Sequence, residues 1–563
     1  MVRRSHAPRS RHPDARRRSR PVGVRPTMTG SAEAAPEAES APSWSALRAE
    51  LSRQRAASRE LGGPSAIAAV HERGRLTARE RINALLDPGS FRELGALATG
   101  AIHAPGRAPR TAPADGVVTG WGDVEGRRTF VIADDGTLAA GARGPAGNRK
   151  ADLVALLARN NGAPLVWLAE SSVNRFQHTM GSQFAGVVQS RDGGRLPLRA
   201  RHRGAASPVV LAILGHAVGR ASFAASSSDL TVMTESTSSM ALAGPAIVSG
   251  ALGVDLTAAE LGGADVHRRT GLVDIVATDE VRAMLAIRRY LSFVPAHSGS
   301  GPMWQPPSDP PQRRCDELVG IVPLNYRRAY DMRRVIETVI DDRDFLEVAD
   351  RFAMNVSCGL ARIGGHPVGI VANNPMHLAG IIEPKAIRKI MRFVQMCERL
   401  NMPLVVLQDQ PGVMVGPQVE EERVFAYVHR LAETMRGVTV PVITVLVRKC
   451  YGFSYLILGS RAFGGDSVVA WPSASISLAG PEAGLSTVLA RERRDGTLSL
   501  ERRNELVQRY VTDARARSAA LDGRIDDIID PADTRAHIAR QLAVFHRRAE
   551  RITTDSKRVA EVP

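Results

Sequence analysis

The chain has few of the residues on which several common protein classes depend. Only four of its 563 residues are cysteine, and they form no C-x-x-C pair, which argues against a zinc ribbon or a disulfide framework. No run of about 18 apolar residues occurs, so no segment is expected to span a membrane. The G-x-x-x-x-G-K-[ST], G-x-S-x-G and H-E-x-x-H motifs are also missing, which excludes the usual signatures of P-loop, serine-hydrolase and zinc-protease chemistry. Scattered cysteines fit a reduced, cytoplasmic protein best.

Basic residues are in excess, and the formal net charge is +16. Residues 1–27 hold nine Arg and one Asp, so half of the excess lies in a Pro-rich leader without aromatic residues. Such a segment buries too little apolar surface to fold, and it lacks the apolar stretch of a secretory signal. Its prolines oppose the amphipathic helix of a mitochondrial transit peptide. A solvated tail, or a true start at Met28, fits better. No aromatic and basic stacking pattern indicates a nucleic-acid partner.

The tetrapeptide Leu-Ala-Gly-Pro occurs twice, and the strand-like sequences around it repeat as well. Three pairs of matching positions have similar spacings: Leu242 and Leu478 lie 236 residues apart (478 − 242), Pro164 and Pro403 239 (403 − 164), and Pro208 and Pro441 233 (441 − 208). Small drifts in spacing are what loops of unequal length produce. We therefore predict a duplicated domain; the alternative is two unrelated α/β domains that share common turn chemistry.

The length also favours two domains, because a single core stops growing at roughly 250–300 residues. Helical spacing of apolar residues covers about residues 45–86. Beyond it, β-like runs alternate with helical ones in both halves, which predicts an α/β fold. The predicted organisation is a disordered basic leader and linker (1–43), a first domain (44–295), a Pro-rich linker (296–314), a second domain (315–550) and a tail (551–563).

Each half contains a buried strand that enters a glycine-bearing turn and then a helix, LGHAVGRASF at 214–223 and RKCYGFSY at 448–455. The first turn of a helix exposes amides that lack intrahelical partners, and glycine permits a ligand to approach closely. Two such turns facing one cleft would bind oxyanions. His216 beside the first turn is a candidate general base, although a single loop histidine is more often structural.

Several longer motifs identify a family. GRLTARERINALLDPGSFRELGAL, DGVVTGWGDVEGR, LGGADVHRRTGLVD, YDMRRV, HPVGIVANNPM, DQPG and RKCYGFSYLILGSR occur between about Gly74 and Leu485. Over this span the chain resembles the carboxyltransferase (β) subunits of biotin-dependent acyl-CoA carboxylases. The resemblance implies two tandem crotonase-like ββα superhelical domains. It also implies a homo-hexamer, with active sites between the N-domain of one subunit and the C-domain of another.

The resemblance further implies a division of labour between the two turns. The N-domain turn, at Val218 and Gly219, would stabilise the enolate of an acyl-CoA. The C-domain turn, at Phe453 and Ser454, would hold the ureido oxygen of carboxybiotin. No AMKM-like biotinylation site and no ATP-binding motif occurs, so the biotin carrier and biotin carboxylase would be separate chains. The remaining implied contacts are Gly452, Tyr451, Asp409 and Gly412 on the biotin side, and Ser171, Ser172, Arg175, Gly215, Arg220 and the chain-length-tuning Leu456 on the substrate side.

Three motifs depart from the family pattern. DSGGARIQ of the family is ESSVNRFQ here (170–177), AGGA is VGRA (218–221) and YGGAY is YGFSY (451–455). A side chain at a position that requires positive φ would cost about 1–2 kcal/mol. Two alternatives to the carboxyltransferase therefore stay open: a biotin-independent decarboxylase or other enolate-forming enzyme, and a non-catalytic scaffold subunit.

Overall fold

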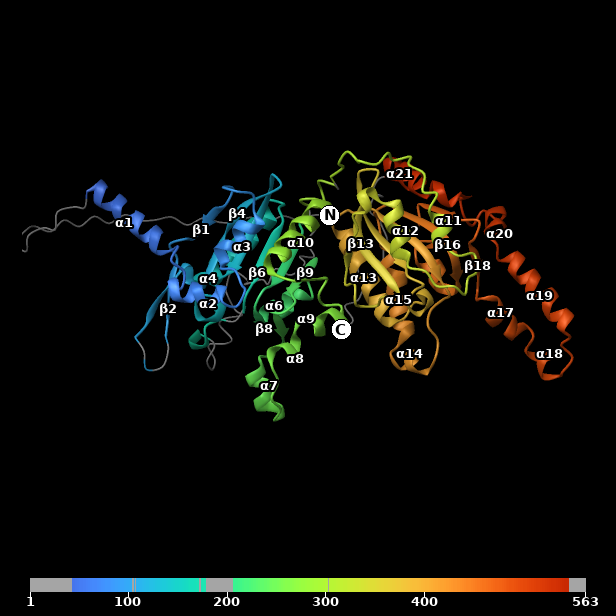
Figure 1. Ribbon diagram of the computed structural model, residues 1–563, viewed down its shortest axis with the longest axis horizontal. Helices are drawn as coiled ribbons and strands as arrows, with labels where there is room; N and C mark the ends of the chain where they lie inside the picture. Colours follow the sequence, from blue (N-terminus) through green and yellow to red (C-terminus); the bar gives the residue numbers. More distant parts are fainter. Residues whose placement is uncertain are drawn as a thin grey trace, which may run out of the picture. The chain divides into compact units, whose positions relative to one another are not determined.

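The computed structural model describes residues 43–103, 106, 108–171, 174–178, 206–301 and 303–545. The chain divides into two compact units, Met1–Ser52 and Arg53–Pro563, and each is described by itself. Helix α1 (Trp44–Ala57) begins in the first unit and contains no buried residue. Both large β-sheets lie in the second unit (Figure 1).

A seven-stranded sheet, counted over the described residues, forms the core of the first half of this second unit. Its strands, in order across the sheet, are β1 (Arg92–Leu94), β4 (Val117–Val124), β5 (Arg127–Asp134), β6 (Leu165–Ala169), β7 (Val209–Ile213), β9 (Leu230–Thr234) and β11 (Ile275–Ala277). The first three pair antiparallel and the rest pair parallel. Parallel strands covered on both faces read as continuous apolar runs, and all five residues of β6 are buried.

An eight-stranded sheet, again among the described residues, forms the second half in the same order. Its strands are β12 (Leu346–Val348), β13 (Val356–Ile363), β14 (His366–Asn373), β15 (Leu404–Gln410), β16 (Val442–Tyr451), β17 (Ser467–Ala470) and β19 (Asp527–Ile528), with β18 (Ser475–Ser477) paired to the end of β16. An antiparallel β12–β14 segment is again followed by parallel pairs. The two halves share one topology.

The predicted duplication is confirmed at the level of single strands. β6 and β15 begin 239 residues apart (404 − 165), and β7 and β16 begin 233 apart (442 − 209). Short strands β10 (Ser239–Ala241) and β18 begin 236 apart (475 − 239). Each leads into Leu-Ala-Gly-Pro, whose proline is the first residue of α7 (Pro245–Leu252) or α17 (Pro481–Val488). Proline is favoured there because its fixed φ suits a helix start.

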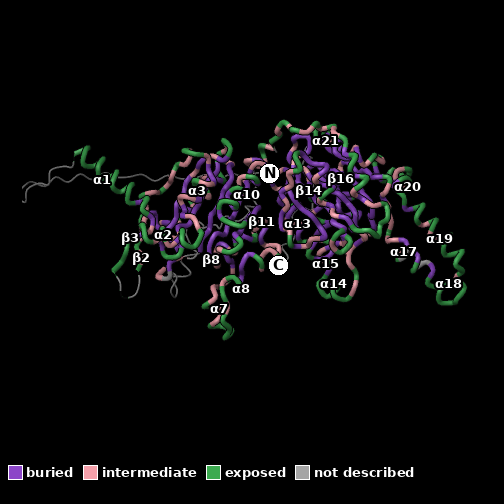
Figure 2. Tube along the Cα trace, in the orientation of Figure 1, coloured by how far each residue is buried: buried purple, intermediate pink, exposed green. Residues whose placement is uncertain are grey.

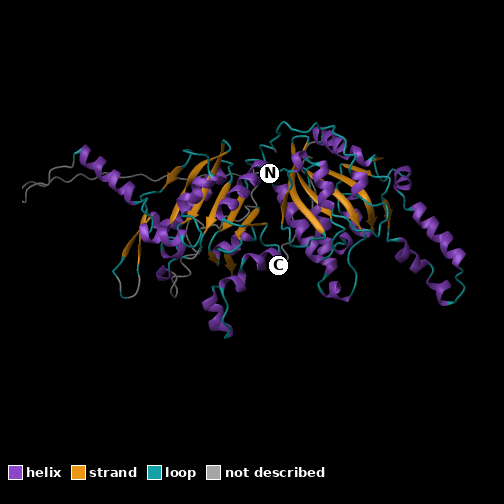
Figure 3. Ribbon diagram, viewed as in Figure 1, coloured by secondary structure: helices purple, strands orange, loops and turns teal. Residues whose placement is uncertain are grey.

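Helices cover both faces of each sheet (Figure 3). The alternating side chains of β6 pack against helices on opposite faces of the first sheet. Leu165 and Trp167 pack with α4 (Pro145–Asn160) and α6 (Arg220–Ala225) in one core, whereas Val166 and Leu168 pack with α3 (Ala78–Leu85) and α10 (Glu280–Phe293) in another. Successive strand residues point to opposite faces. The other helices and strands of this half are α2 (Pro64–His71), α8 (Ala258–Gly262), α9 (Ala264–Thr270), β2 (Thr99–Ile102), β3 (Arg110–Pro113) and β8 (His216–Val218).

One hydrophobic core joins the two halves. It contains buried residues of α3 and α10 from the first half and of α13 (Pro384–Arg399) and α15 (Val424–Arg436) from the second. In Figure 2 the strands at the centre of each half are mostly coloured as buried. Within this core the Tyr290 hydroxyl lies 3.7 Å from the sulfur of Met396. The remaining helices of the second half are α11 (Leu318–Ile321), α12 (Met332–Val339), α14 (Pro417–Glu421), α16 (Gly452–Ile457), α18 (Ala490–Arg494), α19 (Leu500–Asp513), α20 (Ala516–Leu521) and α21 (Thr534–Val544).

The Pro-rich segment 296–314 is hydrogen-bonded to both halves. The Ser298 amide donates to the carbonyl of Ala206 in the first half (2.8 Å). The Trp304 indole donates to the carbonyl of Gly364 (3.1 Å). The guanidinium of Arg535 on α21 donates to the carbonyls of Asp309 and Pro310, both at 3.2 Å. This segment connects the halves as the sequence predicts, but it lies on the protein as ordered structure. The domain boundaries themselves stay a prediction.

Within the described part of the chain, no helix combines the length and the apolar character needed to cross a membrane.

Candidate functional site

The first glycine turn connects β8 to α6. Gly219 has φ 66° and ψ −107°, a combination that residues with a Cβ rarely adopt. The Val218 amide donates to the carbonyl of Ser171 (3.1 Å), and the Gly219 amide donates to that of Ala241 (3.3 Å). Both amides are therefore used inside the fold. Their assignment as hydrogen-bond donors to a thioester oxygen stays a prediction.

The second glycine turn connects β16 to α16. Gly452 has φ 69°, and a Cβ on it would lie 3.3 Å from the carbonyl oxygen of Leu478 and 3.9 Å from the Cα of Gly412. Two backbone segments thus approach each other at positions where both residues are glycine. Phe453 and Ser454 follow in the first turn of α16, so their amides lack intrahelical acceptors.

Strand pairing shows which positions in the two turns correspond. His216 of β8 pairs with Ser239 of β10, and Lys449 of β16 pairs with Ser475 of β18, in the same parallel arrangement. The glycine of each turn lies three residues after His216 or Lys449, respectively. Gly219 therefore corresponds to Gly452, and residues 220–221 correspond to 453–454. The first-turn amides of α6 begin at Arg220.

The two substituted glycines do not strain the backbone. Positive φ falls on Gly219 and Gly452, whereas Arg220 and Phe453 are absent from the described non-glycine residues with positive φ. The Phe453 ring packs edge-to-face against Phe463, with centroids 6.0 Å apart, and its side chain is 49% exposed. Leu456, one turn further along α16, is 37% exposed. The benzyl group is thus directed toward the segment that follows α16.

Gln410 holds the second turn in place, a role that the sequence analysis missed; its position in the DQPG motif is the only sequence signal for it. Its buried side chain accepts hydrogen bonds from the Gly412 amide and the Ser454 hydroxyl, both at 2.7 Å. Its amide nitrogen donates to the carbonyl of Tyr451 (3.4 Å). One side chain therefore contacts Gly412 on one backbone segment and Tyr451 and Ser454 on the other, and it fixes the distance between the two segments.

Asp409 is a buried carboxylate that is fully engaged inside the protein, and its expected contact with biotin stays a prediction. Its side chain has no exposed surface. One oxygen accepts from the Tyr330 hydroxyl and from Arg448, both at 2.9 Å, and the other accepts from the amide and the ammonium of Lys449, both at 3.1 Å. Burial lowers the pKa of Lys449, and Asp409 opposes that shift. The carboxylate fixes the end of β16 just before the turn.

Glu170 occupies the matching place at the end of β6, and the sequence interpretation did not single it out. Its two carboxylate oxygens pair with Arg75 and Arg81, and Arg81 also pairs with Glu280 at 2.6 Å. Burial alone would raise the pKa of Glu170, but the two guanidiniums lower it below its usual value. A Cβ on Gly215 would lie 2.7 Å from the Glu170 carbonyl oxygen. Gly215 is therefore required by close packing here, whether or not substrate contacts it.

Arg175 is also buried and paired. Its side chain is 3% exposed, and its guanidinium contacts Asp115 at 2.6 Å. The other oxygen of Asp115 accepts from the amide of Gly147 in the first turn of α4 (2.8 Å). Through Asp115, Arg175 fixes the start of α4. Its expected contact with the substrate stays a prediction.

The remaining predicted residues divide into three cases. Ser171 is buried and contributes its carbonyl to the Val218 amide. Ser172 lies outside the described residues. The side chain of His216 is exposed, and its Nδ1 lies 2.9 Å from the hydroxyl of Ser239. No acidic partner of the kind that orients a general base is bonded to His216 within the described chain.

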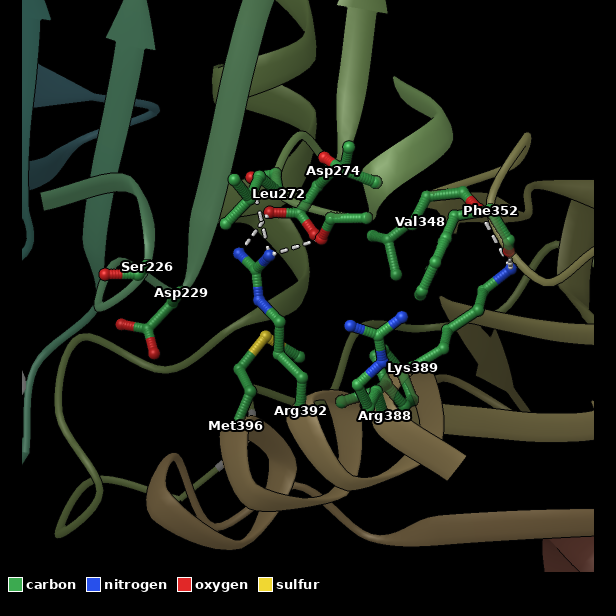
Figure 4. Close-up of a pocket in the computed structure, with 14 residues that line it drawn as sticks. Ser226, Asp229, Leu272, Asp274, Val348, Phe352, Arg388, Lys389, Arg392 and Met396 are labelled. Atoms are coloured by element: carbon green, nitrogen blue, oxygen red, sulfur yellow. Dashed lines mark hydrogen bonds and ion pairs between the residues drawn. The ribbon is translucent and has the colours of Figure 1, made fainter. Parts of the chain in front are cut away.

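A cavity of about 190 Å³ lies elsewhere, between the two halves (Figure 4). Two of its basic residues are already engaged. Arg392 donates to Asp274 (2.8 Å) and to the carbonyl of Gly271 (3.0 Å). Lys389 donates to three main-chain carbonyls at 2.8–2.9 Å. None of the residues that line the cavity belongs to either glycine turn, so we assign the chemistry to the turns.

Two sheets of one topology, each delivering a buried strand through a glycine turn into a short helix, define a duplicated crotonase-like protein. The family model of the carboxyl transferase domain matches residues 69–560. The chain belongs to this carboxyl transferase family, and it is an enzyme of the carboxyltransferase type.

Similar proteins support the same family over nearly the whole chain. The carboxyltransferase subunit of propionyl-CoA carboxylase from Haloferax mediterranei is 35% identical over 517 residues, which cover 91% of this chain and 98% of that protein. The methylmalonyl-CoA carboxyltransferase 12S subunit of Propionibacterium freudenreichii is 34% identical, over 88% and 93% of the two chains. A solved transcarboxylase 12S, a hexamer with methylmalonyl-CoA and methylmalonic acid bound, superposes with a TM-score of 0.82 and 33% identity, over 90% and 96% of the two chains.

Proposed function

We propose that this chain moves CO2 from carboxybiotin, carried on a separate protein, to the α carbon of an acyl-CoA through a backbone-stabilised enolate. The pair of corresponding glycine turns at Gly219 and Gly452 is the observation that carries this proposal. Each turn places the first amides of a short helix at the carboxyl end of a parallel sheet, where ligands bind in open α/β folds.

The first turn would bind the thioester carbonyl through the first-turn amides of α6, beginning with Arg220. Negative charge develops on this oxygen when the α proton leaves. An amide that already points at the oxygen stabilises the charge without reorganising, and loss of one such donor typically lowers kcat by about 10²–10³. The internal bonds of Val218 and Gly219 hold the turn rigid, and so support the amide of the next residue.

The second turn would bind the ureido oxygen of biotin through the amides of Phe453 and Ser454. Gly412 and Gly452 approach each other closely, so main-chain atoms lie on both sides of these amides. The Phe453 ring lies against Phe463. In this position the ring would leave the amides of Phe453 and Ser454 accessible to a ligand. Carboxybiotin supplies CO2 and a basic ureido nitrogen. Leu456 would face the acyl chain, and its apolar side chain disfavours a charged group there.

The site would form between subunits of a homo-hexamer, as in the 12S relative. Large apolar side chains are exposed around both turns. In the first half they include Phe223 (57%), Leu242 (76%) and Ile247 (68%), and in the second Val415 (85%) and Leu478 (85%). Large apolar side chains exposed in such numbers favour an interaction face. The other partners would be a biotin carboxylase and a biotin carrier.

The location would be cytoplasmic. Cys315, Cys358, Cys397 and Cys450 are all buried and none is in a disulfide, which fits a reducing compartment.

Ordinary backbone conformations at Arg220 and Phe453 remove one reason for the two alternatives, the decarboxylase and the scaffold subunit, namely the strain expected from side chains in these turns.

The decisive experiment combines this chain with a biotin carboxylase, a carboxylated carrier and a panel of acyl-CoAs. The expected result is a carboxylated acyl-CoA whose formation stops when the carrier is omitted. Release of CO2 from malonyl thioesters without biotin, and no carboxylation of any acyl-CoA, would establish the decarboxylase instead. Absence of turnover in both assays would indicate the scaffold role.

A further inference from the structure

The cavity between the two halves is lined by segments of both. The loop before β9 and the residues between α9 and β11 come from the first half, whereas the end of β12, the loop after it and helix α13 come from the second. Hydrogen bonds join the halves beside it. The Ala349 amide donates to the carbonyl of Asp274 (2.8 Å), and the Arg392 guanidinium donates to that of Gly271 (3.0 Å). A ligand in this cavity would therefore contact both halves at once.

Part of the cavity lining is apolar and well buried. Four of its side chains belong to residues that are at most 7% exposed, namely Val348, Phe352, Phe393 and Met396. The cavity volume is about 190 Å³, and an apolar cavity of about 150 Å³ is enough to bind benzene. The cavity is thus large enough for a six-membered ring that carries one polar substituent.

Arg388 on α13 adds a charge that the fold does not neutralise. Its guanidinium stacks on the Phe352 ring at 5.5 Å, and in Figure 4 it points into the space between Arg392 and Val348. It has no hydrogen bond and no ion pair to any residue that the structure describes. Stacking engages the face of a guanidinium, whereas its N–H donors lie in the plane of the group. These donors therefore remain available to an acceptor in the cavity.

The other charged groups leave the cavity positive. Asp274 is paired with Arg392 at 2.8 Å, and Asp229 is paired with Arg399. The Lys389 ammonium donates to three main-chain carbonyls, which carry no formal charge. Three cations and two carboxylates line the cavity, a net charge of +1 (3 − 2). This balance favours an anion over a cation at the arginine whose charge is not paired.

We propose that this cavity binds a small carboxylate whose apolar body is about the size of the benzoate ring. The apolar body would lie against Phe352 and Phe393. The carboxylate would accept two parallel hydrogen bonds from Arg388, because a planar guanidinium matches the two oxygens of a carboxylate. None of the lining residues belongs to either glycine turn, so this site goes beyond the proposed function and does not depend on it.

The test compares two probes of the same shape, benzoate and benzamide, by ligand-observed NMR titration of the full chain. We expect benzoate to bind about tenfold or more tightly, because its hydrogen bonds to a guanidinium are charge-assisted and those of the neutral amide are not. A large excess of coenzyme A should leave benzoate binding unchanged. Displacement by coenzyme A would place benzoate at the thioester site and overturn the proposal.

Three variants locate the binding site. Arg388→Gln should remove the preference for benzoate. Ser226→Trp places a ring at an exposed position on the cavity wall, and it should weaken the binding of both probes. Arg128→Gln is the matched control, because Arg128 is also exposed and stacks on an aromatic ring, that of Trp121 at 4.6 Å, but does not line the cavity. The control should bind both probes as the wild type does.

Melting curves show whether each variant is folded, and the Ser226 variant keeps the test valid if the Arg388 variant unfolds. Absence of binding by both probes, equal affinities for benzoate and benzamide in the wild type, or a preference that survives Arg388→Gln would each overturn the site. A loss of the preference in Arg128→Gln as well would show that benzoate responds to surface charge in general, which also contradicts the proposal.

Discussion

Replacing Gly219 with alanine tests whether the first turn directs an amide at the substrate. At φ 66° and ψ −107°, alanine in the present backbone costs on the order of 1–3 kcal/mol. No atom lies within 4 Å of the added Cβ, so steric overlap contributes nothing further. The chain can avoid the strain by rotating the peptide between residues 219 and 220. That rotation changes the direction of the Arg220 N–H bond.

The expected effect on catalysis is larger than the effect on stability. Loss of one oxyanion donor lowers kcat by about 10²–10³, whereas the strain lowers the melting temperature only slightly in a chain of this size. Gly253→Ala is the matched control. Gly253 has φ 68°, its Cβ would also meet no atom within 4 Å, and it ends α7, away from the turn.

The assay measures initial rates of acyl-CoA carboxylation with saturating carboxylated carrier, beside melting curves for both variants. We expect similar melting temperatures and a large loss of kcat only in Gly219→Ala. Wild-type kcat in Gly219→Ala, or equal losses in both variants, would refute the assignment of the amide that follows Gly219.

Three further predictions concern buried charges and thiols. Asp409→Asn leaves the buried cations Arg448 and Lys449 without their counter-charge, so we expect a loss of about 3–5 kcal/mol in stability; an unchanged melting curve would contradict this. Burial lowers the pKa of Lys150 to about 8, so the folded state binds fewer protons than the unfolded state above that pH, and its stability deficit shrinks as pH rises from 8 toward 10.5. Lys150→Met should therefore melt above the wild type at pH 7, with a gap that narrows at higher pH; a constant gap would disprove the link. Burial raises the pKa of the Cys358 thiol to about 12, and all four cysteines are buried, so a maleimide at pH 8 should label them only after unfolding, and rapid native labelling would disagree.

The duplicated fold was predictable because its signals are local and repeated. Apolar runs such as that of β6 mark buried strands, and proline and glycine mark where strands and helices begin and end. Matching proline and Leu-Ala-Gly-Pro positions, repeated at spacings of 233–239 residues, indicated two copies of one topology. The strand order confirms this duplication. Family motifs then added the type of chemistry.

Contacts between distant segments decided the details of the site. The amides of Val218 and Gly219 are bonded to Ser171 and Ala241, and only strand register brings these residues together. Asp409 and Arg175 look like ligand-binding residues in their motifs, but their partners in other elements bury them. The sequence shows which groups can donate or accept a hydrogen bond. It does not show which of them become partners in the folded protein.

The sequence by itself therefore determined the class of fold, the duplication and the family, because hydrophobic periodicity and turn residues act over a few positions along the chain. Only the tertiary structure decided which turn amides have acceptors inside the fold, and which buried charges pair with one another. These outcomes depend on hydrogen bonds and charges that act through space between residues far apart in sequence.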